Sequence, residues 1–322
     1  MRSFSKATAG LVILFALATS GCTADSGNAK RTESLTSYAP YVSALTASDN
    51  DTAGSPTTYN LAFVIADGSD CTPSWSGVYG LDDSKVASRI AELQASGATI
   101  RVSFGGASGD ELAAQCDSAD ALAQAYGEAL DVAGATQADF DIEGDELSDS
   151  DSVDLRSEAI AQLQEEWSDL AVTFTLPVMP SGLDDDSIAL LDSANNHGVQ
   201  VSTVNLMTMN YGESYDGDMG DYALTSAKAA HTQLREVFGT SSAAAWRGMA
   251  LTSMIGANDV DGETFTLQDA AQVRAFAEEK EIGWVSMWST FRDQECADDD
   301  DSLTTCSGVE QSAGAFGEAF SG

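Results

Sequence analysis

Eight apolar, strand-like runs recur along this chain of 322 residues, and stretches with helical periodicity separate most of them. The runs are residues 38–42, 59–67, 98–106, 138–144, 170–178, 201–209, 249–256 and 282–288. The helix-like stretches are residues 83–96, 118–132, 152–167, 185–197, 222–238 and 266–280. Strands that alternate with helices indicate parallel β-α units, and eight such units predict an α/β fold, the (β/α)8 or TIM barrel, in a single domain.

A doubly wound open sheet is the alternative to the barrel. It receives no support as a dinucleotide-binding fold, because no GxGxxG motif follows an early strand-like run. In a barrel, active sites lie at the carboxyl ends of the strands, so residues at the ends of the runs are the first candidates for function.

The N-terminus has the features of a bacterial secretory signal. Arg2 and Lys6 precede an apolar segment, residues 7–19, that is short for a membrane span, and small residues then lead to Cys22. This pattern predicts a lipoprotein-type signal with lipidation at Cys22; ordinary cleavage nearby, with Cys22 free, is the alternative. The predicted parts are a signal peptide at 1–21, a polar tether at 22–36 and one domain at 37–322.

The cysteine count fits an oxidising compartment. There are five cysteines, and setting Cys22 aside leaves four, an even number that suggests two disulfides in a secreted chain. Three pairings are possible. We favour a local bridge between Cys296 and Cys306, which leaves Cys71 to pair with Cys116.

Composition excludes several functional classes. The formal net charge is −37, so the chain has nothing with which to neutralise nucleic-acid phosphates. Its two histidines, His197 and His231, exclude a multi-histidine zinc site and disfavour a Ser-His-Asp triad. The acid runs 148–154 and 298–301 lack the glycine and terminal glutamate of an EF-hand loop. We expect no metal and no cofactor.

The segment DFDIEG, residues 139–144, places three acids at alternate positions: Asp139, Asp141 and Glu143. In a strand these side chains share one face, and Phe140 and Ile142 share the other. Like charges this close do not all ionise cheaply, so such a cluster favours acid-base chemistry. A solvated edge strand in an acidic protein is the alternative, but Glu143 ends the fourth run, where a barrel places its catalytic groups.

Other strand ends carry glycines and aromatic residues. Gly105 and Gly106 end the third run and leave room for a ligand or a neighbouring side chain. Tyr211 follows the sixth run, and Trp288 ends the eighth. Carboxylates among aromatic side chains are typical of a carbohydrate site, since sugar rings stack on aromatic faces.

Several motifs, in this order, resemble those of glycoside hydrolase family 18 in its bacterial chitinase-like form. They are SFGG (103–106), DFDIEG (139–144), NLMTMNYG (205–212), MIGANDV (254–260) and SMWSTFRDQE (286–295). The resemblance covers essentially the whole predicted domain. It implies a hydrolase of β-1,4-linked N-acetylglucosamine polymers or oligomers. Together with the signal-like N-terminus, we expect a secreted monomer anchored to the outer face of the cell membrane through Cys22.

The resemblance also implies a substrate-assisted retaining mechanism. Glu143 would be the general acid and base, and the substrate's own acetamide would form an oxazolinium ion. Asp141 would hold the acetamide N–H, and Asp139 would share a proton with Asp141. Tyr211 would donate to the acetamide oxygen.

Further substrate contacts follow from the resemblance. Trp288 would form the floor under the reacting sugar, and Met207 matches the family motif. Asn210 departs from the motif, because related chains commonly carry Asp there. Trp75, in the segment CTPSWSG, is a further candidate for a sugar platform, with a lid or core role as the alternative.

Two other functions stay open at this point. An endo-β-N-acetylglucosaminidase acting on glycoprotein glycans would use the same chemistry. A non-catalytic chitooligosaccharide-binding lipoprotein would need no general acid, and the presence of Glu143 therefore argues against it.

Overall fold

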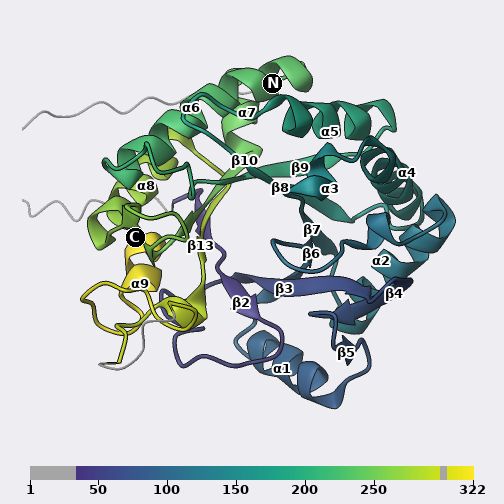
Figure 1. Cartoon of the computed structure of the whole chain (residues 1–322), viewed down its shortest axis with the longest axis horizontal. Coiled ribbons are helices and arrows are strands. Elements are labelled where there is room, and N and C mark those ends of the chain that lie inside the picture. Colours follow the sequence, from purple (N-terminus) through teal and green to yellow (C-terminus); the bar gives the residue numbers. More distant parts are fainter. Residues whose placement is uncertain (1–33, 298–302) are drawn as a thin grey trace, which may run out of the picture. The chain divides into compact units, whose positions relative to one another are not determined.

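The computed structural model describes residues 34–297 and 303–322, and the strands of this part form a closed parallel barrel (Figure 1). The barrel strands are β1 (Ser37–Tyr38), β2 (Tyr41–Ser43), β3 (Thr58–Asp67), β6 (Thr99–Gly105), β7 (Gln137–Asp141), β8 (Ala171–Pro177), β9 (Val201–Met207), β10 (Met249–Met254) and β13 (Trp284–Trp288). Each predicted run contains one of the eight barrel positions, with β1 and β2 sharing the first. The prediction of a (β/α)8 barrel is confirmed.

Pro40 divides the first barrel strand and closes the ring. On one side of it, the Ala39 N–H donates to the Val285 carbonyl oxygen of β13 at 3.0 Å. On the other side, the Asn60 N–H of β3 donates to the Pro40 carbonyl oxygen at 2.9 Å. Proline has no N–H with which to continue the first ladder, so the chain changes partner here.

Six long helices surround the barrel, and they are the six that the sequence predicts (Figure 1). They are α1 (Ser84–Gln94), α2 (Ala119–Ala133), α4 (Ser150–Glu166), α5 (Asp185–Asn196), α6 (Met219–Val237) and α8 (Leu267–Lys280). Each begins after an Asp, Ser or Thr whose side chain accepts from a backbone N–H of the first turn. Residues 44–57, all of them described, connect β2 to β3 through turns rather than a helix.

Shorter elements decorate the barrel, and two hairpins among them extend its wall. The strands are β4 (Asp70–Trp75), β5 (Tyr79–Gly80), β11 (Gly256–Ala257) and β12 (Thr264–Phe265). The short helices are α3 (Asp145–Ser148), α7 (Ser242–Arg247), α9 (Ala315–Ser321) and the 3-10 turns η1 (Leu112–Ala114) and η2 (Thr290–Arg292). β4 pairs antiparallel with the end of β3, and β11 and β12 follow β10.

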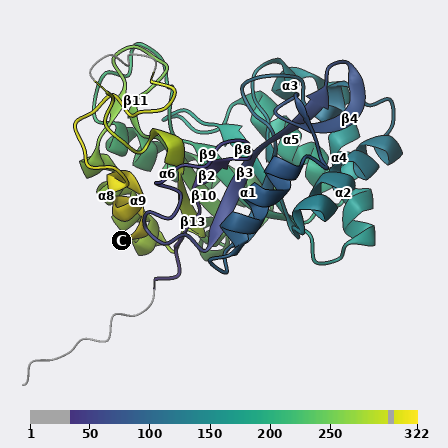
Figure 2. The ribbon, with the colours of Figure 1, turned by 90° about the horizontal axis from the view of Figure 1, so that it is seen from below.

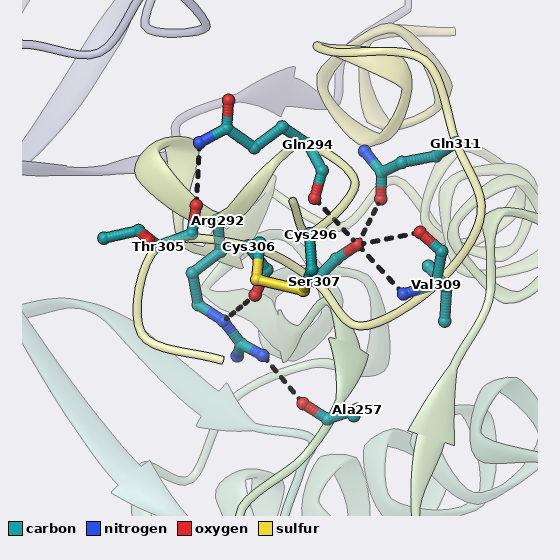
Figure 3. The surroundings of a disulfide bond; sticks show 9 residues. All are labelled: Ala257, Arg292, Gln294, Cys296, Thr305, Cys306, Ser307, Val309 and Gln311. Atoms are coloured by element: carbon teal, nitrogen blue, oxygen red, sulfur yellow. Dashed lines mark hydrogen bonds between the residues drawn. A yellow bond between two sulfur atoms is a disulfide. The ribbon is translucent and has the colours of Figure 1, made fainter. Parts of the chain in front are cut away.

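Both predicted disulfides are present, Cys71–Cys116 and Cys296–Cys306. The first joins β4 to the segment between η1 and α2. Around the second, the Arg292 guanidinium donates to the carbonyl oxygens of Cys306 at 3.3 Å and Ala257 at 2.7 Å (Figure 3). Arg292 therefore ties the segment after β13 to the hairpin after β10.

The strands of the acid motif present different chemistry to their two faces. Phe140 of β7 points toward the helices, where its ring stacks on Phe104 at 5.2 Å and meets the edge of Tyr126 from α2 at 5.0 Å. Asp139 and Asp141 share the opposite face of the same strand, toward the barrel interior. The alternation predicted for DFDIEG therefore separates core packing from the acids.

Several predicted features fall outside the described residues: the signal, Cys22 with its lipid, most of the tether, and the acid run 298–301. One tether residue belongs to the barrel, because Thr36 is buried and its hydroxyl donates to the carbonyl oxygens of Ala277 and Ile282. None of the helices in the described part of the chain is long and apolar enough to cross a membrane.

Candidate active site

A cavity of about 280 Å³ lies at the carboxyl ends of the barrel strands. Figure 2 shows α3, which follows β7, and β11, which follows β10, at the same end of the barrel. The predicted site residues that line the cavity are Asp141, Glu143, Met207, Asn210 and Trp288. A wider groove between α2 and α4, about 400 Å³, lies on the outside of the barrel and contains none of these side chains.

Asp139 is fully buried and surrounded by hydroxyl donors. Its Oδ2 accepts from the Tyr41 hydroxyl and from the Ser103 hydroxyl, both at 2.8 Å, and its Oδ1 accepts from the Thr175 hydroxyl at 2.6 Å. Burial raises the pKa of Asp139, while these hydroxyls and the charge of Arg101 act in the opposite direction. Three donors favour the ionised form, so Asp139 ionises more easily than its buried neighbour Asp141.

Asp141 lies one step further along the same face and has the opposite environment. Its Oδ1 is buried and has no hydrogen-bond partner among the described residues. Burial, then the charge of Glu143, then that of Asp139, raises the pKa of Asp141 well above its ordinary value. These causes favour the protonated form of Asp141 over that of Asp139, and the carboxyl group keeps free hydrogen-bonding capacity toward the cavity.

Glu143 follows β7 and is half-buried at the cavity wall. Burial, and after it the charge of Asp259, raises the pKa of Glu143. A raised pKa suits a general acid that must carry its proton near neutral pH. Three acidic side chains with raised pKa values thus lie in a row from the barrel interior to the cavity, and the pKa of Asp141 is raised most strongly by burial and by its two acidic neighbours.

Trp288 forms an aromatic floor together with two residues that sequence reasoning missed. Its ring stacks on Phe63 at 5.6 Å with 25° between the planes, and Tyr41 meets it edge-on at 5.8 Å. All three line the cavity. Such a surface suits the apolar face of a pyranose ring, as predicted for Trp288.

Gly105 and Gly106 serve the packing of this floor rather than the ligand. Both have positive φ, +87° and +92°, which favours glycine. A Cβ on Gly106 would lie 2.8 Å from the Phe63 ring, and one on Gly105 would collide with the Asp141 carbonyl oxygen. The sequence predicted that these glycines leave room either for a ligand or for a neighbouring side chain. In the structure, the Phe63 ring lies against Gly106 and the backbone of Asp141 lies against Gly105.

Tyr211 does not itself line the cavity, but its buried hydroxyl has no hydrogen-bond partner among the described residues, so its role as a donor stays a prediction. Tyr211 is buried outside the cavity lining, with its ring against Tyr215 at 5.9 Å and Tyr222 at 5.8 Å. The backbone turns at Asn210, whose φ is +53°, and this turn breaks the strand alternation that would have carried Tyr211 inward. Met209 lines the cavity in its place.

The prediction of Trp75 as a sugar platform is wrong. Its side chain is 0% exposed and belongs to the hydrophobic core, because residue 75 lies within β4 rather than in a loop. A ring without an exposed face has no surface on which a sugar can stack. The core role was the alternative, and β4 was not recognised because Pro73 and Gly77 made the segment read as a turn.

Two further cavity residues, Thr175 and Asp259, were not predicted as site residues. Thr175 lies on the fifth strand-like run, and counting inward positions along that run finds it. Asp259 lies in the motif MIGANDV, which was quoted without assigning a role to its acid. Its place at the cavity depends on the hairpin β11–β12, for which the sequence gives little periodic signal.

No group of three or more metal-ligating side chains in residues 34–297 and 303–322 has the arrangement of a metal site. Asp139 and Asp141 share one face of β7, and hydroxyl groups donate to both carboxylate oxygens of Asp139.

Comparison with known proteins gives one consistent picture. No protein-family model matches the chain. It is 34% identical over 275 residues to a probable bifunctional chitinase/lysozyme of Escherichia coli strain K12, which covers 80% of this chain and 31% of that protein. It is 34% identical over 248 residues to endochitinase 11 of Metarhizium anisopliae, covering 73% of this chain and 47% of that protein. The chain thus spans less than half the length of either curated relative.

A solved structure covers both chains more fully. The catalytic domain of a hyperthermophilic chitinase from Pyrococcus furiosus aligns with a TM-score of 0.77 and 30% sequence identity. The alignment covers 88% of this chain and 93% of that domain. The likeness therefore extends over most of both chains.

Proposed function

This chain belongs to glycoside hydrolase family 18, and on that premise we propose that it is a chitinase that hydrolyses β-1,4-linked N-acetylglucosamine chains. One observation carries the proposal: the buried Asp141 Oδ1, which lacks a partner among the described residues, lies in the cavity wall between Asp139 and Glu143. An acetamide N–H is the kind of group that this oxygen can accept. An aromatic floor under the same cavity fits the sugar ring to which the acetamide is attached.

Glu143 begins the proposed reaction as an acid. It donates its proton to the glycosidic oxygen while the bond from that oxygen to the anomeric carbon breaks. The substrate's acetamide carbonyl oxygen attacks the anomeric carbon from the opposite face and closes an oxazolinium ring. No carboxylate of the protein needs to bond to the sugar, which agrees with an acid row that lies along one wall.

Asp141 and Asp139 support the charge that this step creates. Asp141 accepts the hydrogen bond of the acetamide N–H, and the N–H becomes more acidic as the ring closes. Asp139, with three hydroxyl donors, can share the proton of Asp141 and leave more negative charge beside the ring. Such preorganised groups, placed where charge develops, are a large part of enzymatic rate enhancement.

Glu143 ends the reaction as a base. It takes a proton from a water molecule whose oxygen attacks the anomeric carbon, and the carbonyl oxygen leaves. Two inversions give net retention, so the first product is the β-anomer. Trp288 and Phe63 hold the ring in place during both steps.

The experiment is hydrolysis of chitohexaose by the purified protein, with the anomers followed by NMR early in the reaction. We expect initial β-anomer from the wild type and a rate lowered by about 10²–10⁴-fold in Glu143→Gln. Asp145→Asn is the matched control, since Asp145 is an exposed acid two residues on that does not line the cavity. Folded wild-type protein that binds but does not cleave the sugar would contradict the proposal.

We also propose that the chain acts outside the cell as a monomer, anchored to the membrane by a lipid on Cys22. The signal-like N-terminus supports export, and the two disulfides suit an oxidising compartment. Metabolic labelling with a fatty acid, compared between wild type and Cys22→Ala, tests the anchor. Equal labelling of both proteins would contradict it.

A further inference from the structure

The turn between β11 and β12, residues 258–263, contributes Asp259 to the cavity wall. Asn258 fixes the start of this turn, because its side-chain amide donates to the carbonyl oxygens of Met254 at 2.9 Å and Gly256 at 3.1 Å. The first carbonyl belongs to the last residue of β10 and the second to the first residue of β11. The position of Asp259 is therefore built from the barrel outward and does not depend on a free loop.

Asp259 is also fixed from its other side, by the loop after β9. The Asn210 amide donates to Asp259 Oδ2 at 3.3 Å, and the Asp259 N–H donates to Asn210 Oδ1 at 3.1 Å. Glu263, at the end of the same turn, accepts from the Gly212 N–H at 2.7 Å. Three hydrogen bonds thus tie the turn to the loop, and Asp259 is the acidic member of the Asn210–Asp259 pair.

Charges around the cavity set the effect that Asp259 can have. The titratable residues lining it, within the described part of the chain, are Tyr41, Asp141, Glu143 and Asp259. Asp259 is the carboxylate that raises the pKa of Glu143, after burial. Arg292 lies beneath the turn, where burial lowers its pKa to about 10 and Asp259 acts in the opposite direction. Arg292 bonds to the carbonyl of Ala257 rather than to Asp259.

We propose that Asp259, which Asn210 holds at the wall of the cavity that Glu143 also lines, is a positioning residue of the active site whose carboxylate tunes proton donation by Glu143. This inference rests on the proposed function of Glu143. It assigns this effect on Glu143 to a residue that the hairpin β11–β12, rather than the acid strand β7, contributes to the cavity wall.

The sign of the effect follows from the charge. Removing a negative neighbour makes ionisation of Glu143 easier, so its pKa falls and the form able to donate a proton is lost at lower pH. The basic limb of kcat/KM against pH should move to lower pH by about half a unit in Asp259→Asn. Asp259 is exposed, so added salt should shrink the difference between the two proteins.

The experiment compares four proteins: wild type, Asp259→Asn, Asn210→Asp, and the double variant that exchanges the two residues. Asp261→Asn is the matched control, because it removes an exposed charge from the same turn outside the cavity lining. Each protein is assayed for kcat/KM on chitohexaose across pH. The Glu143 carboxyl carbon is also titrated directly by ¹³C NMR, assigned with Glu143→Gln, which needs no turnover.

We expect the basic limb of kcat/KM and the NMR titration midpoint of Glu143 to move together. Both should lie at lower pH in Asp259→Asn, return toward the wild-type pH in the exchanged double variant, and stay unchanged in Asp261→Asn. An unchanged NMR titration of Glu143 in a folded Asp259→Asn protein would overturn the inference. A shifted titration without any hydrolysis by the wild type would instead refute the proposed function and leave the electrostatic role of Asp259 standing.

Discussion

The protein buries two carboxyl clusters close to the end of β7, and they are balanced in opposite ways. Glu111 is fully buried and accepts from Arg156 at 2.6 and 3.0 Å, from the Tyr126 hydroxyl at 2.5 Å and from the Ala113 N–H at 2.9 Å. Asp141, equally deep in the fold, has a buried oxygen with no partner among the described residues.

The difference separates a structural acid from a working one. A buried carboxylate with a bidentate cation has its charge neutralised and its lone pairs occupied, so it has little left to offer a ligand. A buried carboxyl group without such partners is costly for the fold and persists where its free capacity is used. The Glu111–Arg156 pair joins the segment after β6 to α4, whereas Asp141 faces the cavity.

The largest expected effect is on activity at the unbalanced cluster. Asp141→Asn keeps the size of the side chain but removes the negative charge that would stabilise the oxazolinium ion. We expect kcat to fall by about 10²–10³-fold while the protein stays folded. The measurement is hydrolysis of chitohexaose beside the Asp145→Asn control. Retention of more than a tenth of wild-type kcat would show that Asp141 does not differ from the structural acid Glu111 in the proposed way.

The next effect is on stability at the balanced cluster. Arg156→Met leaves Glu111 buried without its cation, and we expect a loss of about 3–5 kcal/mol in the free energy of unfolding. Urea unfolding measures it. The double variant Glu111→Gln/Arg156→Met should recover part of the loss, because the uncompensated charge is gone. A single variant as stable as the wild type would show that the pair does not support the fold.

A smaller effect concerns the pH dependence of stability. The raised pKa of Asp141 means that the folded protein holds a proton that the unfolded chain releases above about pH 4. This contribution to stability is fully present below about pH 4 and is lost as pH rises toward the folded pKa. Asp141→Asn removes the loss, so its Tm should exceed that of the wild type at pH 7 and match it near pH 4. A lower Tm at pH 7 would contradict this sign.

The smallest effect tests whether Tyr211 contacts the substrate. Because its ring packs with Tyr215 and Tyr222 outside the cavity lining, Tyr211→Phe should change kcat/KM by less than about threefold. Met209→Ala, which alters the cavity wall itself, should have the larger effect on KM. The reverse order would restore Tyr211 as a substrate contact.

The sequence was sufficient for the frame of the molecule and for the acid strand. Strand and helix periods are local signals, and they placed all eight barrel positions and six helices. The period of two in DFDIEG predicted which residues face inward, and cysteine arithmetic with a local bridge predicted both disulfides.

What sequence reasoning missed depends on non-local contacts or on single backbone angles. The left-handed φ of Asn210 turned Tyr211 away, and motif order alone does not reveal that turn. Trp75 was predicted to lie in a loop, because the pairing of its strand β4 with β3 and β5 is not visible in the local sequence. Asp259 reaches the cavity through a short hairpin, and its role is visible only beside Asn210.

The most direct test of the account is the protonation state of Asp141 at neutral pH. Infrared difference spectroscopy between the wild type and Asp141→Asn, each at pH 7 without substrate, measures it through the carbonyl stretch of a protonated carboxyl group. The account predicts that this band is present in the wild type and absent from the variant. A wild type that shows only the ionised carboxylate signal for Asp141 would contradict the claim that Asp141 is protonated before the substrate binds.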